Sequence, residues 1–232
     1  MYKRIVLKLS GESLAGSDRK GFDAARVDEV AEVIAKLRAN GVQTAVIMGG
    51  GNIWRGRFTD EMNPVNADQM GMLATVINAL CVCDALNRKG CPAKVFTAQE
   101  MTRFADLYTR DRAIEQLEAG KVIFIAGGSG NPFFTTDTAA ALRCAELNAD
   151  AVFKGTTVDG IYDRNPNLPG AVLLKDITYA EAVEKQLKIM DTTAFLLCRE
   201  QNVPEIRVFN MNRLENIVDV ALGSDIGTVA HP

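Results

Sequence analysis

The sequence predicts an α/β fold, in which a mainly parallel central sheet lies between two layers of helices as a three-layer sandwich. The first observation is that short apolar runs rich in β-branched residues alternate with longer segments of helical periodicity. The second is that glycine turns follow directly on several of these runs, at residues 49–51, 127–130 and 155. Ligands bind beyond the carboxyl ends of strands in open α/β sheets, so the same turns predict where the site lies.

The bulk composition is that of a globular protein without an extended charged surface. With 232 residues the chain is long enough for one large domain or two fused lobes, and no linker, repeat or low-complexity tract divides it. We therefore expect a single domain over residues 1–232. A net charge of −3 does not favour nucleic acid, and no apolar run approaches the roughly 20 residues of a membrane span. The first residues lead straight into a strand rather than a signal peptide, so we expect a cytoplasmic protein that binds neither nucleic acid nor membrane.

Cysteine and histidine usage restricts the chemistry. The cysteines are odd in number and form no CxxC pair, which predicts reduced thiols that fill the core: Cys81, Cys83, Cys91, Cys144 and Cys198. The one histidine, His231, is next to last, which excludes Ser-His-Asp and Cys-His mechanisms and most zinc sites. Any chemistry must therefore use lysine, arginine, aspartate and backbone amides, with or without Mg²⁺.

The first two strands are predicted over residues 4–9 and 43–48. Lys8 lies near the carboxyl end of the first strand, beside the Ser10-Gly11 turn, where a lysine can equally be an edge charge. The helix between the strands, residues 23–40, has apolar residues on one face, namely Val27, Val30, Ile34 and Leu37. Three consecutive glycines at 49–51 allow backbone N–H groups to approach an anion, and Arg55 can add a forked cationic donor.

A long helix is predicted over residues 67–89, after an exposed loop at 57–66. One of its faces is apolar, with Met70, Leu73, Ile77 and Leu80. Asp68 is expected in its first turn, where the helix dipole alone would favour a carboxylate. A short strand at 93–96, an unassigned stretch at 101–110, a helix at 111–119 and a buried strand at 122–125 follow.

The stretch at residues 126–137 joins that buried strand to a helix at 138–147. Free N–H groups at a helix start attract phosphate. Asp137 at this helix start can cap the helix, or it can hold Mg²⁺ between phosphates. A strand at 150–154 then ends in Lys154, and residues 163–167 turn the chain. Helices at 179–188 and 191–201, a strand at 206–209 and a last helix that ends near 222–223, with Asn212 as its cap, complete the prediction.

The glycine turns and the two strand-end lysines together predict one crest lined with phosphate-binding groups. The P-loop pattern is absent, neither long glycine turn completes GxGxxG, and HRD and DFG are missing. Phosphoryl transfer needs mainly positioning and neutralisation of charge, which lysines, an arginine, backbone amides and a carboxylate supply without histidine.

The chain resembles the bacterial UMP kinases, a branch of the amino acid kinase family, over essentially its whole length. The motifs that carry the resemblance are residues 8–12, 49–56, 68–75, 130–137, 154–160, 188–191 and 207–211. The stretch at 126–137 and the helix with Asp68 are specific to this branch, whereas the N-terminal lysine motif is shared more widely. The resemblance implies the amino acid kinase fold and transfer of the γ-phosphoryl group of ATP to UMP, which gives UDP and ADP in pyrimidine nucleotide biosynthesis.

The resemblance also implies residue roles. The catalytic residues would be Lys8, Arg55, Asp137 and Asp191, with Asp191 orienting Lys8. UMP would contact Gly50, Arg55, Asp68, Ser129, Gly130, Asn131, Pro132, Phe133, Phe134, Thr135 and Thr136. ATP would contact Lys8, Leu9, Ser10, Gly11, Gly51, Arg55, Lys154, Thr156, Tyr162 and Asn165. Mg²⁺ would be held mainly by the ATP phosphates, with Asp137 as a candidate ligand.

The resemblance further implies a homohexamer that GTP activates and UTP inhibits, and residues 16–21 are similar to the family's activation loop. Two alternatives stay open. One is a kinase of the same fold that acts on a carboxylate or a carbamate, which would have no use for the Asp68 helix or for residues 131–134. The other is a non-catalytic nucleotide or oxyanion binder, which would not need Lys8 and Asp137 together.

Overall fold

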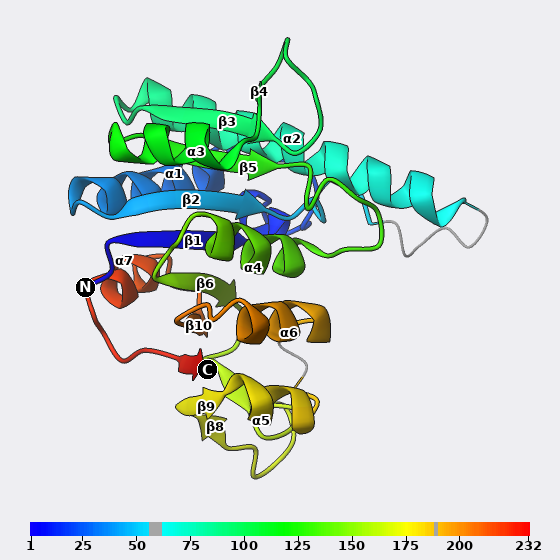
Figure 1. Ribbon diagram of the computed structural model, residues 1–232, viewed down its shortest axis with the longest axis vertical. Coiled ribbons are helices and arrows are strands. Elements are labelled where there is room, and N and C mark those ends of the chain that lie inside the picture. The colour runs from blue at the N-terminus through cyan, green and yellow to red at the C-terminus, as the bar shows by residue number, and fades with distance from the viewer. Residues whose placement is uncertain (56–61, 188–189) are drawn as a thin grey trace.

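A twisted, mainly parallel sheet forms the centre of the protein, with helices on both of its faces (Figure 1). The computed structural model describes residues 1–55, 62–187 and 190–232. Within these residues the large sheet has the strand order β4-β3-β5-β2-β1-β6-β10-β11-β9, and the pair β10–β11 is antiparallel. Its strands are β1 (Arg4–Leu9), β2 (Gln43–Met48), β3 (Ala93–Thr97), β4 (Asp106–Leu107), β5 (Val122–Ala126), β6 (Ala151–Thr156), β9 (Asp176–Thr178), β10 (Ile206–Asn210) and β11 (Thr228–His231). The predicted three-layer α/β architecture is confirmed.

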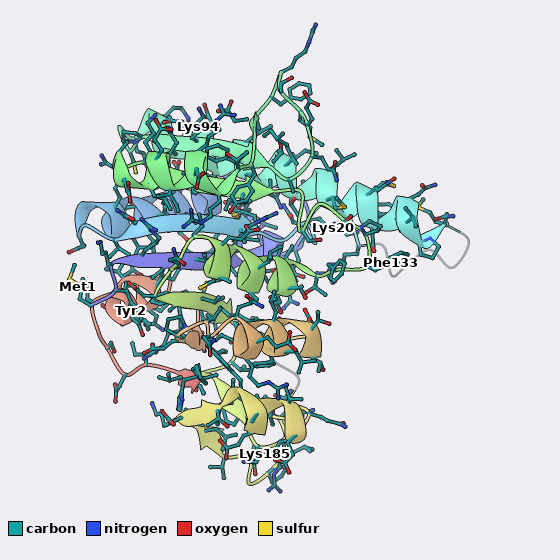
Figure 2. The ribbon with its side chains drawn as sticks, in the orientation of Figure 1. Met1, Tyr2, Lys20, Lys94, Phe133 and Lys185 are labelled. Carbon is teal, nitrogen blue, oxygen red and sulfur yellow. The ribbon has the colours of Figure 1, made fainter. Side chains whose placement is uncertain are left out.

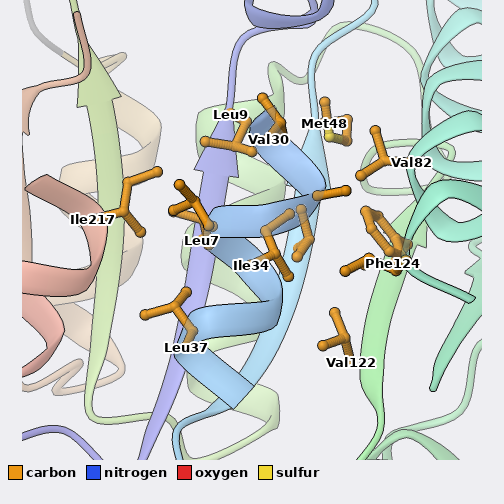
Figure 3. Close-up of a cluster of buried hydrophobic side chains, with 14 of the residues drawn as sticks. Leu7, Leu9, Val30, Ile34, Leu37, Met48, Val82, Val122, Phe124 and Ile217 are labelled. Carbon is orange, nitrogen blue, oxygen red and sulfur yellow. The ribbon is translucent and has the colours of Figure 1, made fainter. Parts of the chain in front are cut away.

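The helices form two layers because successive side chains of each strand point to opposite faces of the sheet. In β1, Leu7 packs in one buried cluster and Val6 in the other. The first cluster, which Figure 3 shows in part, includes residues of α1 (Ala24–Ala39), α2 (Pro64–Arg88) and α7 (Asn216–Ala221). The second includes residues of α3 (Arg110–Glu118), α4 (Thr136–Glu146), α5 (Tyr179–Glu184) and α6 (Thr192–Glu200). A short 3₁₀ turn, η1 (Gly11–Leu14), follows β1, and β7 (Ile161–Tyr162) pairs with β8 (Leu173–Leu174) as a separate hairpin.

Most predicted elements lie where the apolar periodicity indicates. The apolar face of α1 is buried, with Val27, Val30, Ile34 and Leu37 at 5 % exposure or less. All five cysteines are free thiols, and four are buried. Burial raises the pKa of the Cys83 thiol to about 11, which keeps it protonated and unreactive.

Helix α2 begins earlier than predicted. Pro64 is its first residue, and the Asn63 side chain accepts the N–H of Val65 at 2.9 Å as the cap. The predicted loop at 57–66 is therefore wrong at residues 64–66, while residues 56–61 lie outside the described part of the chain. The shift moves Asp68 to the fifth residue of the helix, beyond the first turn. Stabilisation of the positive helix end is thus not a sufficient reason for a carboxylate at this position.

The predicted apolar face of α2 is exposed rather than buried. Met70, Leu73, Ile77 and Leu80 lie on one face as predicted, and each is at least 36 % exposed. The opposite face packs against α1, β3 and β5 and includes the fully buried polar residue Asn78. Among the described helices, α2 is long and apolar enough to cross a membrane by length and composition alone. Its buried face, which is mostly apolar but includes Thr75 and Asn78, is that of a core helix, and its exposed apolar face needs a separate explanation.

The C-terminal part contains the other errors. Asn212 does not cap the last helix, because α7 starts at Asn216 and Glu215 precedes it. The N–H of Asn212 instead donates to the Asn210 side chain at 2.7 Å, within the turn after β10. The helix predicted at 179–188 ends at Glu184, with residue 188 outside the described residues. Strand β4 lies in the unassigned stretch at 101–110, and β7, β8, β9 and β11 carry no prediction because they have only two to four residues.

Candidate functional site

The predicted crest exists at the carboxyl ends of β5, β2, β1 and β6, which are neighbours in the sheet. Lys8 and Lys154 are register partners on adjacent parallel strands, so the two cations lie side by side. The turns at residues 49–51 and 127–130 follow β2 and β5 at the same edge of the sheet. The two lysines and the two glycine turns therefore lie at one edge of the sheet, as the strand ends in the sequence predict.

Asp137 holds both lysines. Its Oδ1 lies 2.9 Å from Lys8 Nζ, and its Oδ2 accepts a short hydrogen bond from Lys154 Nζ. The three side chains are only 10–15 % exposed, so this is a buried cluster of two cations and one anion. Burial alone would raise the pKa of Asp137, but the charges of Lys8 and Lys154 outweigh it and the pKa is lowered. Burial lowers the pKa of Lys154, and the charge of Asp137 partly opposes this effect.

Asp137 is not the cap of its helix. The cap of α4 is Thr135, whose hydroxyl accepts the N–H groups of Asp137 at 3.1 Å and Thr138 at 3.3 Å. Asp137 is the second residue of the helix, and its side chain is directed to the lysines instead. The structural alternative for Asp137, a helix cap, is therefore wrong.

Asp191 lies at the start of α6 and holds the start of α4. Its carboxylate accepts the N–H of Ala194 as the α6 cap, the Thr138 hydroxyl at 2.9 Å, and a short hydrogen bond from the Thr135 hydroxyl. These contacts connect Asp191 to Lys8 through the first turn of α4, rather than directly. An orienting role for Asp191 thus acts through the position of Asp137.

A cavity lies between the start of α2 and the loop that follows β5. The predicted UMP residues Gly50, Asp68, Asn131, Phe134 and Thr136 line it. The predicted residues 129, 130, 132, 133 and 135 belong to the same loop, and Phe133 projects from it beside α2 (Figure 2). Asp68 Oδ2 accepts the backbone N–H of Phe133 at 2.6 Å, so Asp68 joins α2 to this loop.

Sequence reasoning missed part of the cavity wall. The residues that line it without having been predicted are Trp54, Ala67, Gly71, Met72, Thr75 and Gly128. Trp54 Nε1 donates to the Ala67 carbonyl at 2.8 Å, which fixes the indole against α2. A glycine inside a helix, Gly71, was a usable signal, because such a residue costs helix stability and often permits a close approach.

Arg55 is held beside the first glycine turn. Its guanidinium forms a short ion pair with Glu12 and donates from Nε to the Gly51 carbonyl at 3.0 Å. Glu12 also lies 3.9 Å from Arg19 in the 16–21 segment. Glu12 was not predicted, although its position two residues after Ser10 in the turn that follows Lys8 was an available signal.

The predicted ATP residues divide between the crest and a second cavity. Tyr162 and Asn165 line that cavity together with Lys185, which Figure 2 labels next to α5. Thr156 ends β6, and its hydroxyl donates to the Val158 carbonyl at 2.6 Å. Leu9, Ser10 and Gly11 follow Lys8, and the Ser10 side chain caps η1. The structure therefore lays the predicted ATP residues along the edge from β2, which Gly51 and Arg55 follow, to the β7–β8 hairpin.

The donor set at the crest fits a Mg²⁺ ion that is carried mainly by phosphates. Among the described residues no group of three or more His, Cys, Asp or Glu side chains gathers as a metal site. Asp137 Oδ1 is a buried oxygen that lies 2.9 Å from Lys8 Nζ without an aligned hydrogen bond, and because a carboxylate oxygen has more than one acceptor site, it can also serve a cation or its water. Mg²⁺ is commonly bound by one or two carboxylates with substrate phosphates and water, and this arrangement matches that pattern.

Comparison with known proteins identifies the family of the chain. The profile of the amino acid kinase family matches residues 3–210. A uridylate kinase of Bacteroides thetaiotaomicron is 47 % identical over 99 % of this chain and 98 % of its own length. A uridylate kinase of Parabacteroides distasonis is 48 % identical over the same shares. The crystal structure of UMP kinase from Bacillus anthracis superposes with a TM-score of 0.95 at 32 % identity, covering 99 % of this chain and 96 % of that one.

Proposed function

The chain belongs to the amino acid kinase family, and we propose that its lysine–aspartate crest transfers the γ-phosphoryl group of ATP to UMP. It is a nucleoside monophosphate kinase, since full-length relatives at 47–48 % identity are uridylate kinases. The observation that carries the residue assignment is the buried Lys8–Asp137–Lys154 cluster at the carboxyl ends of β1 and β6. The proposal takes residues 1–232 as one domain, because one sheet contains strands from both ends of the chain. It also takes the protein to be cytoplasmic, as expected from the sequence.

In the proposed reaction a phosphate oxygen of UMP attacks the γ-phosphorus of ATP, and the bond to the oxygen shared with the β-phosphate breaks. Lys8 and Lys154 neutralise the charge that spreads over the transferring group and the leaving ADP. Asp137 fixes both ammonium groups before substrate arrives, so they need little reorganisation during the reaction. The ATP phosphates would hold Mg²⁺, with Asp137 as a candidate further ligand, and the ion would supply additional neutralisation of phosphate charge.

The acceptor nucleotide would lie in the cavity between α2 and the loop after β5. Arg55 suits the UMP phosphate, because its planar fork of N–H donors stays charged at every relevant pH. Asp68 only accepts hydrogen bonds, so it suits the ribose hydroxyls instead. Support comes from their placement, with Asp68 in the cavity wall and Arg55 at the glycine turn that follows β2.

The test is an assay of ADP release with UMP, CMP, aspartate, acetylglutamate and carbamate as acceptors. We expect turnover with UMP to exceed turnover with each other acceptor by at least about 100-fold, as for a site that binds its substrate through buried polar groups. Release with an amino acid or carbamate instead would favour the carboxylate or carbamate kinase. No release with any acceptor, together with nucleotide binding, would favour the non-catalytic binder.

A homohexamer is part of the proposal, and the exposed apolar face of α2 supports contacts between subunits. Met70, Leu73, Ile77 and Leu80 form a continuous stripe on this helix, and such a stripe on a surface usually marks a contact. Light scattering at micromolar concentration should give six times the chain mass. A Leu73→Lys, Ile77→Lys variant should give a smaller assembly, whereas a monomer mass for the unaltered protein would reject the hexamer.

Regulation by GTP and UTP extends the proposal and is supported by the resemblance to bacterial UMP kinases. GTP should raise the rate of UDP formation at subsaturating UMP, and UTP should lower it. Residues 16–21 are the candidate element, because Arg19 of this segment lies near Glu12, the partner of Arg55. A rate that neither nucleotide changes would remove regulation from the proposal and leave the catalytic assignment intact.

A further inference from the structure

Two buried asparagines meet behind the glycine turn that follows β2. Asn52 is 3 % exposed and Asn78 of α2 is fully buried. Their amides pair reciprocally, with Asn52 Nδ2 3.1 Å from Asn78 Oδ1 and Asn78 Nδ2 2.7 Å from Asn52 Oδ1. The second hydrogen of each amide reaches a backbone carbonyl, Gly49 at 2.7 Å from Asn78 and Gly21 at 2.9 Å from Asn52.

This pair has one possible orientation. Both outer partners are carbonyl oxygens, which accept hydrogen bonds only, so each amide must present its nitrogen to them. The two oxygens are then left to face the neighbouring amide, and all four amide hydrogens are satisfied. A fully satisfied buried network is rigid, whereas a partly satisfied one is costly, so the pair holds its surroundings in a single arrangement.

The pair joins three segments of the crest. Asn52 holds residue 21 twice, because the N–H of Gly21 also donates to the Asn52 carbonyl at 2.9 Å. Gly11, after Lys8, packs directly against the pair: an added Cβ would be 2.9 Å from Asn78 Nδ2, 2.6 Å from the Gly49 carbonyl, and closer still to Asn52 Oδ1. Loss of either amide would therefore loosen the packing of the turn against the end of β1, while the backbone hydrogen bond from Gly21 to Asn52 would remain.

Helix α2 also holds the second glycine turn. Thr75, one helical turn before Asn78, accepts the N–H of Gly127 on its hydroxyl at 2.8 Å. The same helical face thus contacts the turn after β2 through Asn78 and the turn after β5 through Thr75. Because both contacts come from one rigid helix, they set the spacing between the two turns.

We propose that the Asn52–Asn78 amide pair is a positioning element for phosphoryl transfer, which orients the Gly50 N–H of the glycine turn at residues 49–51, since the Gly49 N–H already donates to the Leu9 carbonyl at 2.8 Å. The carbonyl of Gly49 and the N–H of Gly50 belong to one planar trans peptide and point in opposite directions. Because the Gly49 carbonyl accepts a hydrogen bond from Asn78, the Gly50 N–H is directed away from the buried face of α2 and toward the side on which the nucleotides would bind. This inference rests on the proposed function, since it assigns the pair to the same reaction.

The test compares Asn78→Ala and Asn52→Ala with Tyr179→Phe as a matched control. Tyr179 is a fully buried residue of α5, a helix with no predicted site residue. Its hydroxyl donates to the Val203 carbonyl at 2.9 Å, so loss of the hydroxyl also leaves a carbonyl without its donor. Each asparagine variant should lower kcat by about tenfold or more, because small misplacements of positioning groups are that costly. The KM for UMP should change by less than about threefold, since Asp68 and the other lining residues of α2 and of the loop after β5 are retained and only the Gly50 N–H is redirected. Tyr179→Phe should lower the melting temperature and leave kcat unchanged.

A double variant keeps the proposal falsifiable if a single alanine variant does not fold. Asn52→Leu with Asn78→Leu replaces both amides by apolar groups of similar size, which is tolerated better than the loss of one partner. It should fold and still lose about tenfold or more in kcat, because both carbonyls lack their donors. Unchanged kcat in a folded variant, or an equal loss in Tyr179→Phe, would overturn the positioning role. Failure of the proposed function is distinct, because the unaltered protein would then form no UDP.

Discussion

Replacement of Asp137 by asparagine tests the crest most severely, because one carboxylate holds two buried lysines. Asparagine is nearly the same size and can still accept one hydrogen bond, so the change removes charge and little else. Helix α4 keeps its cap, which is Thr135. The variant therefore separates the electrostatic role of Asp137 from any role in helix formation.

The structure sets the expected size of the effect. At 2.9 Å and an effective dielectric constant of about 20, the Lys8–Asp137 attraction is roughly 6 kcal/mol before desolvation costs. Removal of one partner of a buried ion pair costs about 3–5 kcal/mol of unfolding free energy. We expect about 3 kcal/mol, because Lys154, whose pKa burial already lowers, can release its proton when its partner is lost. Misplaced, partly neutral lysines should cost at least about 100-fold in kcat.

The assay combines chemical denaturation with steady-state rates of UDP formation over a range of Mg²⁺ concentrations. Burial would raise the pKa of Asp137, but the adjacent lysines lower it, so its stabilising contribution is fully present above the ordinary value of 3.8. That contribution is lost as the pH falls through the lowered value, and the variant should lack this acid step. Asp150→Asn is the control, since Asp150 accepts the N–H groups of residues 3 and 4 outside the site. Full activity with unchanged Mg²⁺ dependence in Asp137→Asn would refute the reasoning.

Four further substitutions test separate features of the protein. Asp68→Ala should narrow the preference for UMP over dUMP about tenfold or more, chiefly by harming UMP, because the ribose hydroxyl of UMP loses its charged acceptor. Arg55→Ala should harm both nucleotides alike, and an unchanged ratio of specificity constants in Asp68→Ala would withdraw the ribose assignment. Gly227→Ala should cost about 3 kcal/mol or more of unfolding free energy, because φ of residue 227 is +84° and the new methyl would be 2.8 Å from the Phe209 Cβ. Chemical denaturation measures this cost, and an unchanged denaturation midpoint would contradict it. His231 donates to Asp176, and this hydrogen bond raises the pKa of His231 above 6.5. The stabilisation is full below pH 6.5 and fades as the pH rises through the raised pKa, so the melting temperature should fall over that range and His231→Gln should lack this fall. An unaltered pH dependence of the melting temperature in His231→Gln would assign the effect to another group.

The fold was predictable where strands are long and buried on both faces. β1, β2, β5 and β6 have five or six residues each, and their apolar runs are unmistakable. The short strands at the sheet edge have no such pattern, because two to four residues cannot express a period. The start of α2 was misplaced because Pro64 ends a loop and begins a helix equally well, and the choice depends on the Asn63 cap.

The site was predictable to the level of strand ends and no further. The parallel-sheet rule brings Lys8 and Lys154 together from the sequence, because both end buried strands. It does not give the double pairing of Asp137, which depends on how α4 lies across β1 and β6. The Asn52–Asn78 pair joins residues 26 positions apart in sequence, and only the packing of α2 against the glycine turn brings them into contact.

The same packing explains why α2 was hard to interpret. Several of its large apolar residues, such as Leu73 and Ile77, are exposed, whereas its buried face includes the polar Thr75 and Asn78 beside Val82 and Leu86. A periodicity argument assigns the apolar stripe to the core, and here the polar residues are buried because they hold the crest. The helix thus combines a surface suited to another subunit with a face suited to positioning.

The most direct test of the central claim is phosphorus NMR of a reaction that contains ATP, Mg²⁺, UMP and either the unaltered protein or Lys8→Met, with UMP binding measured in parallel by calorimetry. Lys8 pairs with Asp137 at the end of β1, and neither residue is among those that line the cavity between α2 and the loop after β5. The account predicts that the unaltered protein forms UDP and ADP in equal amounts, whereas Lys8→Met binds UMP normally and forms UDP at least about 100-fold more slowly. Near-normal formation of UDP by Lys8→Met would contradict the account.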